Sequence, residues 1–332
     1  METTELEISN KKNLGQFFSG SLIAKLLAEL ARHNVASTIL DPMNGTGDML
    51  LACQANSRIS KEYFGIEIDK NVFEKSKNRF NHSKTNLHQG NAFSQKIIEL
   101  MSKIQYDLII TNPPYVRYQT IAKNKKSIPD FLNTTEIKSN LIASLSRLDH
   151  LDKEDRKFFE ILISNYSGLS DLAVPSWILC ALNVKVNGRI ALVVPEAWLN
   201  RNYAGVIQYI LLRWFKIEYI VEDGNSVWFQ EAQVKTTLIV AKRIKRKSSI
   251  YSWKDECLMT SSIYSEAMNS KSLLGLAFPK SLNPELRFKK MIDKEETLEG
   301  KFSANKISIA NFAKDVIRSI KHSNWFKLLE PK

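Results

Sequence analysis

Helical and strand-like patterns alternate along the first 243 residues, and this alternation constrains the fold more than any other feature of the sequence. Such alternation is typical of a doubly wound α/β fold, a mainly parallel sheet with helices on both faces. The expected helices cover residues 22–32, 48–53, 71–80, 96–103, 171–184 and 203–214, and the expected strands cover 37–40, 63–67, 106–111, 189–194, 217–221 and 235–241.

A rigid polar loop, Asn112-Pro113-Pro114-Tyr115, follows the expected strand 106–111. In open α/β sheets ligands bind outside the carboxyl ends of the strands. The two prolines fix φ and remove backbone donors, so the Asn112 side chain and nearby carbonyls are placed to accept hydrogen bonds from an NH2 group, with the Tyr115 ring beside them. An ordinary turn followed by a chance tyrosine explains the tetrapeptide alone equally well.

A second loop, residues 41–47, lies between the strand 37–40 and the helix 48–53. Its glycines Gly45 and Gly47 allow the backbone to approach a ligand closely. The next strand ends at Glu67, some twenty residues later, which is the spacing at which a carboxylate accepts hydrogen bonds from ribose hydroxyls in nucleotide-binding sheets. Together these features predict a nucleoside site.

The same loops in the same order resemble class I S-adenosylmethionine-dependent methyltransferases, and within them the gamma-class adenine-N6 DNA methyltransferases of restriction-modification systems. Further segments are similar to motifs of that subgroup, and the resemblance runs from about residue 11 to residue 245. These segments are Gly15–Ser19 before an apolar helix, Tyr166–Leu172, Gly188–Leu199 and Val227–Val234.

The resemblance implies a seven-stranded sheet, S-adenosylmethionine as cofactor and adenine N6 of double-stranded DNA as methyl acceptor. It implies a catalytic loop formed by Asn112, Pro113, Pro114 and Tyr115, with a flipped adenine stacked between Tyr115 and Phe229. The implied cofactor-binding residues are Gln16, Phe17, Phe18, Ser19, Asp41, Pro42, Asn44, Gly45, Gly47, Glu67, Ile68, Asn91, Ala92, Phe93 and Asn112.

The chain departs from the family pattern at several of these positions. Ser19-Gly20 stands where Thr-Pro is usual, Met43-Asn44 where two small residues are usual, and Met49 where Phe is frequent. Asn91 stands where an aspartate commonly binds the cofactor's amino group. The asparagine still accepts through its carbonyl oxygen, but without the charge-assisted bond.

The expected domain organisation is a catalytic domain at 1–245 and a C-terminal segment at 246–332, separated by the basic linker 242–249. That segment resembles the start or a reduced form of a target-recognition domain. DNA specificity then comes from a partner subunit, or the chain is a fragment of a longer protein. An insertion at about 116–165 carries Lys123, Lys125 and Lys126, which either contact the DNA backbone or lie on a solvated helical decoration.

Composition agrees with these expectations. The chain has 332 residues, a formal net charge of +12 and a pI near 9.4, as expected for a partner rich in phosphate. The scattered Cys53, Cys180 and Cys257 indicate reduced thiols, and no zinc-ligand spacing is present. No leader or long apolar stretch is found, so the expected location is the cytoplasm, away from membranes.

Other functions remain open from sequence alone. RNA and protein-glutamine N-methyltransferases also use an Asn-Pro-Pro-Tyr loop or a close variant, because an amide or amino nitrogen presents the same chemical problem. From a different class, the chain is a catalytically silent DNA-binding or scaffold subunit that has kept the methyltransferase fold, an alternative motivated by Met43, Asn44 and Asn91.

Overall fold

A computed structural model describes residues 20–54, 59–80, 84–115, 130–166, 172–195, 207, 210–211, 214–222 and 236–245 of the chain. Seven described strands form one sheet with the order β3-β2-β1-β4-β5-β7-β6. The chain divides into two compact units, residues 1–193 and 194–332. The predicted seven-stranded α/β class is confirmed.

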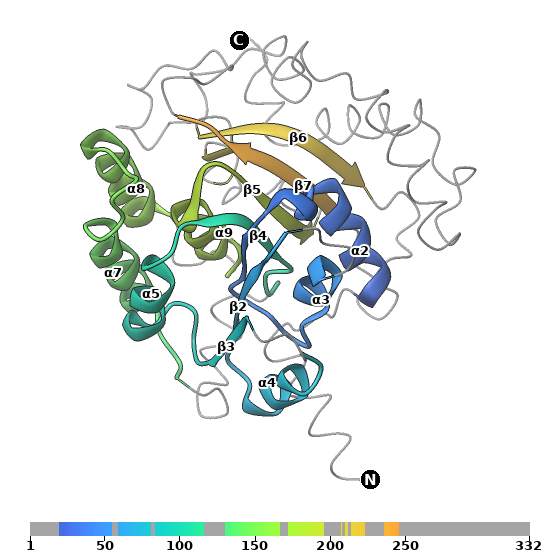
Figure 1. Ribbon diagram of the computed structural model, residues 1–332. Helices are drawn as coiled ribbons and strands as arrows, with labels where there is room; N and C mark the ends of the chain where they lie inside the picture. The colour runs from blue at the N-terminus through green and yellow to red at the C-terminus, as the bar shows by residue number, and fades with distance from the viewer. Residues whose placement is uncertain are drawn as a thin grey trace. The chain divides into compact units, whose positions relative to one another are not determined.

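The first unit contains the parallel part of the sheet (Figure 1). β1 pairs with β2 on one side and with β4 on the other, so the strand order reverses direction beside β1. Ligands bind at such a switch point in open α/β sheets. The strands are β1 (Thr38–Asp41), β2 (Glu62–Glu67), β3 (Thr85–Gln89), β4 (Tyr106–Thr111) and β5 (Val184–Pro195), the last of which ends just past the unit boundary.

Helices cover both faces of these strands. Figure 1 shows α2 (Gly20–Leu30), α3 (Asp48–Gln54) and α4 (Lys70–Lys77) on one face. The other face carries α5 (Gln95–Ser102), α7 (Thr134–Leu145), α8 (Lys153–Asn165) and α9 (Ala173–Asn183). A short 3-10 turn, η1 (His33–Val35), follows α2.

β4 and α9 both contribute fully buried side chains to the core of the first unit. Ile109 and Ile110 of β4 are fully buried, and every residue of α9 is buried, including Trp177. Burying side chains of this size stabilises a fold by about 1.5–3 kcal/mol each. Pro175 lies in the first turn of α9, where its missing N–H would have no helical partner.

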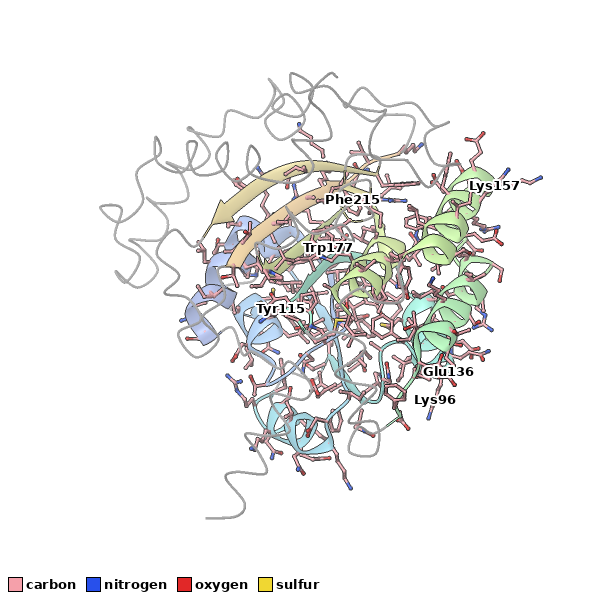
Figure 2. The ribbon with its side chains drawn as sticks, turned by 180° about the vertical axis from the view of Figure 1, so that it is seen from behind. Lys96, Tyr115, Glu136, Lys157, Trp177 and Phe215 are labelled. Carbon is pink, nitrogen blue, oxygen red and sulfur yellow. The ribbon has the colours of Figure 1, made fainter. Side chains whose placement is uncertain are left out.

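Helices α7 and α8 contact α9, and both lie within the insertion expected at about 116–165. Figure 2 shows Glu136 and Lys157 projecting outward from α7 and α8. A capping box of Asn133 and Glu136 begins α7, and Asp152 caps α8. Lys138 donates to the carbonyl oxygens of Ser164 (2.9 Å) and Tyr166 (2.8 Å), so it joins α7 to the end of α8.

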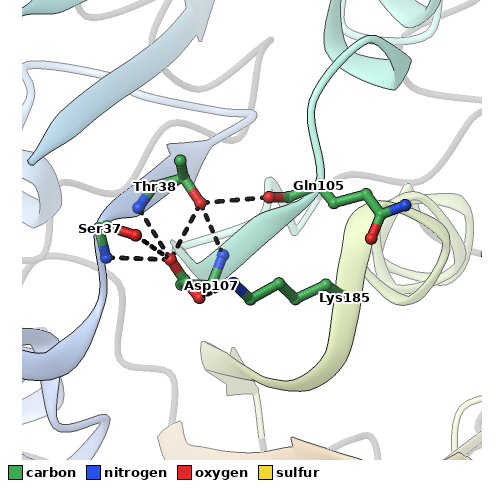
Figure 3. A network of polar contacts seen from close by, with 5 residues as sticks. All are labelled: Ser37, Thr38, Gln105, Asp107 and Lys185. Carbon is green, nitrogen blue, oxygen red and sulfur yellow. Dashed lines mark hydrogen bonds and ion pairs between the residues drawn. The ribbon is translucent and has the colours of Figure 1, made fainter.

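The amino ends of β1, β4 and β5 are joined through Asp107 (Figure 3). Its Oδ2 accepts from the main-chain N–H groups of Ser37 (3.0 Å) and Thr38 (3.1 Å) and from the Ser37 hydroxyl (2.6 Å). Lys185 forms an ion pair with Oδ1. Gly188 is required nearby, because a Cβ there would lie 2.8 Å from the Asp107 carbonyl oxygen. We call these residues the amino edge.

The second unit contains β6 (Phe215–Glu222) and β7 (Thr236–Arg243), which pair antiparallel. The guanidinium of Arg243 is buried, 5.8 Å from the Trp214 ring centroid and 5.5 Å from that of Phe215. Ile207, Ile210, Leu211 and Trp214 are helical, within the expected helix 203–214.

The expected elements within the described residues are confirmed, with boundaries that differ by a few residues. The periodicity analysis did not predict β3. This strand, Thr85–Gln89, is polar and lies at the edge of the sheet, so it lacks the apolar pattern of a buried strand. The expected domain boundary near residue 245 stays a prediction, because residues 246–332 lie outside the described part.

Candidate active site

The catalytic loop and the glycine loop emerge side by side. β1 and β4 are parallel neighbours, with Ile39 opposite Leu108 and Leu40 opposite Ile109. Their carboxyl ends therefore meet at the same edge of the sheet. The Thr111 hydroxyl, at the end of β4, lies 4.0 Å from the Met43 sulfur of the glycine loop. We call the residues at this end of β1, β2, β3 and β4 the carboxyl edge.

The glycine loop turns sharply between β1 and α3. Gly45 and Gly47 have φ values of 54° and 88°, which glycine adopts without strain. A Cβ at Gly47 would lie 2.5 Å from the Phe80 ring, so no larger residue fits there. The main chain is fixed by Asn44 N–H, which donates to the Ile66 carbonyl (2.7 Å), and by Gly47 N–H, which donates to the Asn44 carbonyl (2.8 Å).

The Asn44 side chain points toward α4. Its Nδ2 donates to the Ser76 hydroxyl (2.7 Å), and its Cγ would be 3.0 Å from a Cβ at Gly65. The side chain is buried, and within the described residues its Oδ1 has no hydrogen-bond partner. Asn44 thus joins the loop to α4, and its contact with the cofactor stays a prediction.

Glu67 links the glycine loop to the end of β2. Its Oε2 accepts from Gly45 N–H (2.8 Å) and its Oε1 from Asp69 N–H (2.8 Å). Burial raises the pKa of Glu67 to about 7, although these two hydrogen bonds act in the opposite direction. The carboxyl group is therefore oriented by the backbone, and Ile68 follows it in the turn before α4.

Asp41 ends β1 and is 1% exposed. Its Oδ1 accepts from Met43 N–H (3.0 Å). Burial raises the pKa of Asp41 to about 7, the hydrogen bonds from Thr111 and Met43 lower it, and the charge of Glu67 raises it again. Two neighbouring buried carboxyl groups thus have raised pKa values, which is the environment that an added positive charge would relieve.

The turn after β3 carries Asn91, Ala92 and Phe93, all largely buried. Asn91 Oδ1 accepts from Phe93 N–H (2.9 Å), and its Nδ2 donates to the Asp130 carbonyl (3.0 Å). Asn140 of α7 donates to the Phe93 carbonyl (3.0 Å). Two described residues of the insertion therefore contact the turn that is predicted to hold the cofactor adenine.

In the catalytic loop, Pro113 is buried while Asn112, Pro114 and Tyr115 are partly exposed. The Tyr115 hydroxyl oxygen lies 2.6 Å from the Asn112 side-chain oxygen and 2.5 Å from the Val193 carbonyl oxygen of β5. Burial raises the pKa of Tyr115 well above its ordinary value, so the hydroxyl keeps its proton. Figure 2 labels Tyr115 among the surrounding side chains.

The structure brings together most of the predicted site residues that it describes. Asp41 and Glu67 are the last residues of β1 and β2, and Pro42, Gly45, Gly47 and Asn91 lie in the loops that follow strands, at the same carboxyl edge as the catalytic loop. Gln16, Phe17, Phe18, Ser19 and Phe229 lie outside the described residues, as do Lys123, Lys125 and Lys126.

Sequence reasoning missed four contributors: Thr111, the Val193 carbonyl, Asp130 and Asn140. A local signal does mark Thr111: it is a polar residue at the end of an apolar strand, directly before the catalytic loop. The other three act across long sequence separations, and no local pattern marks them.

Two features are absent from the described part of the chain. No three His, Cys, Asp or Glu side chains there are grouped so that they could hold a metal ion. Among the same residues, no helix has the length and apolar character needed to cross a membrane. Cys53 and Cys180 are buried free thiols.

A family model described as N-6 DNA Methylase matches residues 5–272, most of the chain, so the chain belongs to the N-6 DNA methylase family. The cofactor of such an enzyme is S-adenosylmethionine.

Among individual relatives, the type II methyltransferase M.HincII from Haemophilus influenzae is 25% identical over 73% of this chain and 39% of its own length. The type II methyltransferase M.AccI from Acinetobacter calcoaceticus is 24% identical over 95% of this chain and 53% of its own length. The chain thus spans about half or less of these relatives.

A solved structure shares the fold. It is a modification subunit of a putative type I restriction enzyme from Vibrio vulnificus, aligned over 73% of this chain and 48% of its own with a TM-score of 0.50 and 18% identity.

Proposed function

We propose that this chain is the catalytic region of a restriction-modification methyltransferase that transfers a methyl group from S-adenosylmethionine to adenine N6 in DNA. The observation that carries the proposal is the parallel pairing of β1 with β4, which sets the Asn112–Tyr115 loop beside the glycine loop. Family membership and the two type II methyltransferase relatives support the DNA substrate.

The residues of the site fit the cofactor. When bound, S-adenosylmethionine supplies an electrophilic methyl group on a positively charged sulfur. Asp41 and Glu67 are both buried, and the charge of Glu67 adds to burial in raising the pKa of Asp41, so a cationic ligand would compensate their charge. Glu67 would bind the ribose hydroxyls, Asn91 to Phe93 would hold the adenine, and the small residues Gly45 and Gly47 would leave room for the methionine portion.

The catalytic loop activates the acceptor amine. The lone pair of adenine N6 is delocalised into the ring, so the amine is a poor nucleophile. Hydrogen bonds from the amine to the Asn112 side-chain oxygen and the Pro113 carbonyl localise this lone pair and direct it at the methyl group. Transfer of the methyl group to N6 would leave the sulfur as a neutral thioether, and the proton that the methylated N6 loses would pass to solvent water. Neither buried thiol is needed, because no covalent enzyme intermediate forms.

The partner in this proposal is double-stranded DNA with the target adenine flipped out of the duplex. Tyr115 and Phe229 stack on that base, each contributing about 1–3 kcal/mol. Sequence specificity comes from a separate subunit or from a recognition domain. Support for this division is that M.HincII and M.AccI are longer than the part of them that this chain covers.

The test is production of the complete gene, together with neighbouring restriction-modification genes, in a bacterial host that lacks adenine methyltransferases. Host DNA is digested to nucleosides, and 6-methyladenine is measured by mass spectrometry. Wild-type protein should produce 6-methyladenine, and Asn112→Ala should abolish it while the cofactor still binds. The exposed Asn86 offers a matched control, Asn86→Ala, which should leave the product unchanged.

Two other outcomes would redirect the assignment. Methylated transfer or ribosomal RNA, or methylated glutamine in protein, with unmodified DNA would favour the RNA or protein-glutamine alternatives. Failure of calorimetry to detect S-adenosylmethionine binding would favour a catalytically silent scaffold.

A further inference from the structure

The turn that follows α4, residues 78–80, packs against the glycine loop. Arg79 Nη1 donates to the Thr46 carbonyl oxygen (2.7 Å) and lies 2.9 Å from the Asp48 carboxylate. The Phe80 ring occupies the space beside Gly47, where a Cβ would lie 2.5 Å from it. The turn after α4 therefore contacts three successive residues of the chain, from the glycine loop to the start of α3.

The other end of α4 is joined to the same loop through Glu67. Asp69 is the N-cap of α4, and its side chain accepts from two N–H groups of the first turn. The Asp69 N–H donates to Glu67 (2.8 Å), and Glu67 in turn accepts from the Gly45 N–H (2.8 Å). The contacts thus form a closed ring, which runs from the glycine loop through Glu67 and α4 and returns to the loop through Arg79.

The contact with Thr46 fixes the part of the loop that has the most conformational freedom. Thr46 lies between Gly45 and Gly47, which both have positive φ. An exposed ion pair adds little to stability, and the Arg79 side chain is 43% exposed. A charge-assisted hydrogen bond to the main-chain carbonyl of Thr46 instead restrains the backbone itself. The Thr46 hydroxyl also donates to Asp48 (3.1 Å), so the three side chains form one network.

We propose that Arg79 is a positioning residue, which holds the glycine loop in the conformation that binds S-adenosylmethionine. This inference rests on the proposed function, in which the glycine loop makes room for the methionine portion of the cofactor. Arg79 acts through the Thr46 backbone and needs no contact with the cofactor. Without Arg79, the loop would lose the freedom of its two glycines only when the cofactor binds, and this entropic cost would weaken binding.

A role as a simple charge predicts the opposite result. Arg79 is positive, and the sulfur of S-adenosylmethionine is also positive, so charge alone would make binding tighter when Arg79 is replaced by a neutral residue. S-adenosylhomocysteine, the demethylated cofactor, has a neutral sulfur. Loss of loop positioning should weaken both ligands equally, because the loop surrounds the portion that they share.

The test is calorimetry with S-adenosylmethionine and, separately, with S-adenosylhomocysteine. Arg79→Gln should raise the dissociation constants of both ligands about fivefold. Arg79→Lys should stay within about twofold of the wild type, because both contacts of Arg79 use the same nitrogen and an ammonium group can replace it. The control Lys77→Gln removes a neighbouring exposed charge and should leave both constants unchanged. Unchanged or tighter binding in Arg79→Gln would overturn the proposal.

Steady-state kinetics separates positioning from a general structural role. With Arg79→Gln, KM for the cofactor should rise about fivefold, while kcat at saturating cofactor stays within about twofold of the wild type, because the Asn112–Tyr115 loop is unaltered. A purely structural role would lower Tm and leave KM for the cofactor at its wild-type value, and that result would contradict the proposal.

A measurement on the cofactor-free protein tests the loop directly. The Gly47 N–H donates to the Asn44 carbonyl within the loop (2.8 Å), so its exchange with solvent reports on opening of the loop. Arg79→Gln should speed this exchange about fivefold, and an unchanged rate would refute the inference. Wild-type protein that binds S-adenosylmethionine but yields no 6-methyladenine would instead refute the proposed function and leave this inference standing.

Discussion

The two edges of the parallel sheet in the first unit shift the pKa values of their carboxyl groups in opposite directions. At the amino edge, Asp107 is surrounded by donors: although partial burial by itself raises its pKa, Lys185, Ser37 and Thr38 lower the pKa to about 2. At the carboxyl edge, burial raises the pKa of both Asp41 and Glu67 to about 7.

This difference in carboxyl pKa indicates which edge of the sheet is suited to bind a cationic ligand. Asp107 has compensation within the protein, so its contribution is to stability. Asp41 accepts hydrogen bonds from Met43 N–H and the Thr111 hydroxyl, Glu67 accepts them from backbone N–H groups, and burial still raises the pKa of both, so a cationic ligand would improve their environment. The raised pKa values of the carboxyl groups at the carboxyl edge are thus consistent with a site that binds the cationic S-adenosylmethionine.

The largest expected effect comes from Asp41→Asn, which removes the charge but keeps the shape. Cofactor affinity, measured by calorimetry, should fall by about 30-fold or more, because a buried charge pair is lost. The exposed Asp149→Asn is the matched control and should bind normally. Unchanged cofactor affinity in Asp41→Asn would contradict the inference that the carboxyl edge binds the cationic cofactor through Asp41.

The same variant should stabilise the free protein at pH 8. The folded-state pKa of Asp41 is raised from 3.8 to about 7, so its favourable contribution is complete below pH 3.8 and is lost as the pH rises through 7. Removing the buried charge should raise Tm at pH 8 by about 2 °C or more. A lower Tm would show that the ionised carboxylate is already compensated.

At the amino edge, Asp107→Ala should lower the free energy of unfolding by about 2 kcal/mol at pH 7, as measured by urea denaturation, because several hydrogen bonds and an ion pair are lost. Its pKa is depressed, so the stabilisation exists above the unfolded-state value of 3.8 and disappears as the pH falls toward 2. Cofactor affinity should stay within about twofold of the wild type. A large loss of affinity would show that the two edges are coupled.

Cofactor binding should also depend on pH through the carboxyl edge. A bound cation favours the ionised carboxylates, so affinity should increase about tenfold per carboxyl group between pH 6 and pH 8, with release of protons. Calorimetry in buffers of different ionisation enthalpy measures that release. Glu67→Gln should reduce the dependence, and proton uptake on binding would contradict the assignment.

The smallest expected effect on cofactor affinity concerns the hydrogen bond between the insertion and the turn after β3. Asn140→Ala removes the hydrogen bond to the Phe93 carbonyl and should weaken cofactor binding about threefold. The neighbouring Ser139→Ala, on an exposed position of α7, is the control. Equal affinities for the two variants would mean that the insertion only covers α9.

Much of the fold was predictable because its signals are local. The apolar run 106–111 corresponds to β4 residue for residue, and helices α3, α4, α5 and α9 begin and end within a few residues of their predicted positions. β3 was not predicted by periodicity, because a polar edge strand is stabilised by its pairing with β2 and not by its own pattern.

Part of the candidate site carries a signal in the sequence. Gly45, Gly47 and Glu67 were recognised from spacing; in the structure both glycines have positive φ and Glu67 accepts from Gly45 N–H, while their roles toward the cofactor stay predictions. Asn44 was assigned to cofactor binding, but its side chain pairs with Ser76, thirty-two residues away. No spacing rule reports such a contact, so the role of its side chain at the cofactor stays a prediction.

The sequence by itself determined the alternating helices and strands and the identity of the two loops, because periodicity, glycine and proline act within a few residues. Only the tertiary structure decided that the loops meet, that Asp107 is compensated while Asp41 is not, and that Val193 and Asn140 support the site. Strand order and burial set those outcomes, and both depend on which distant segments pack together.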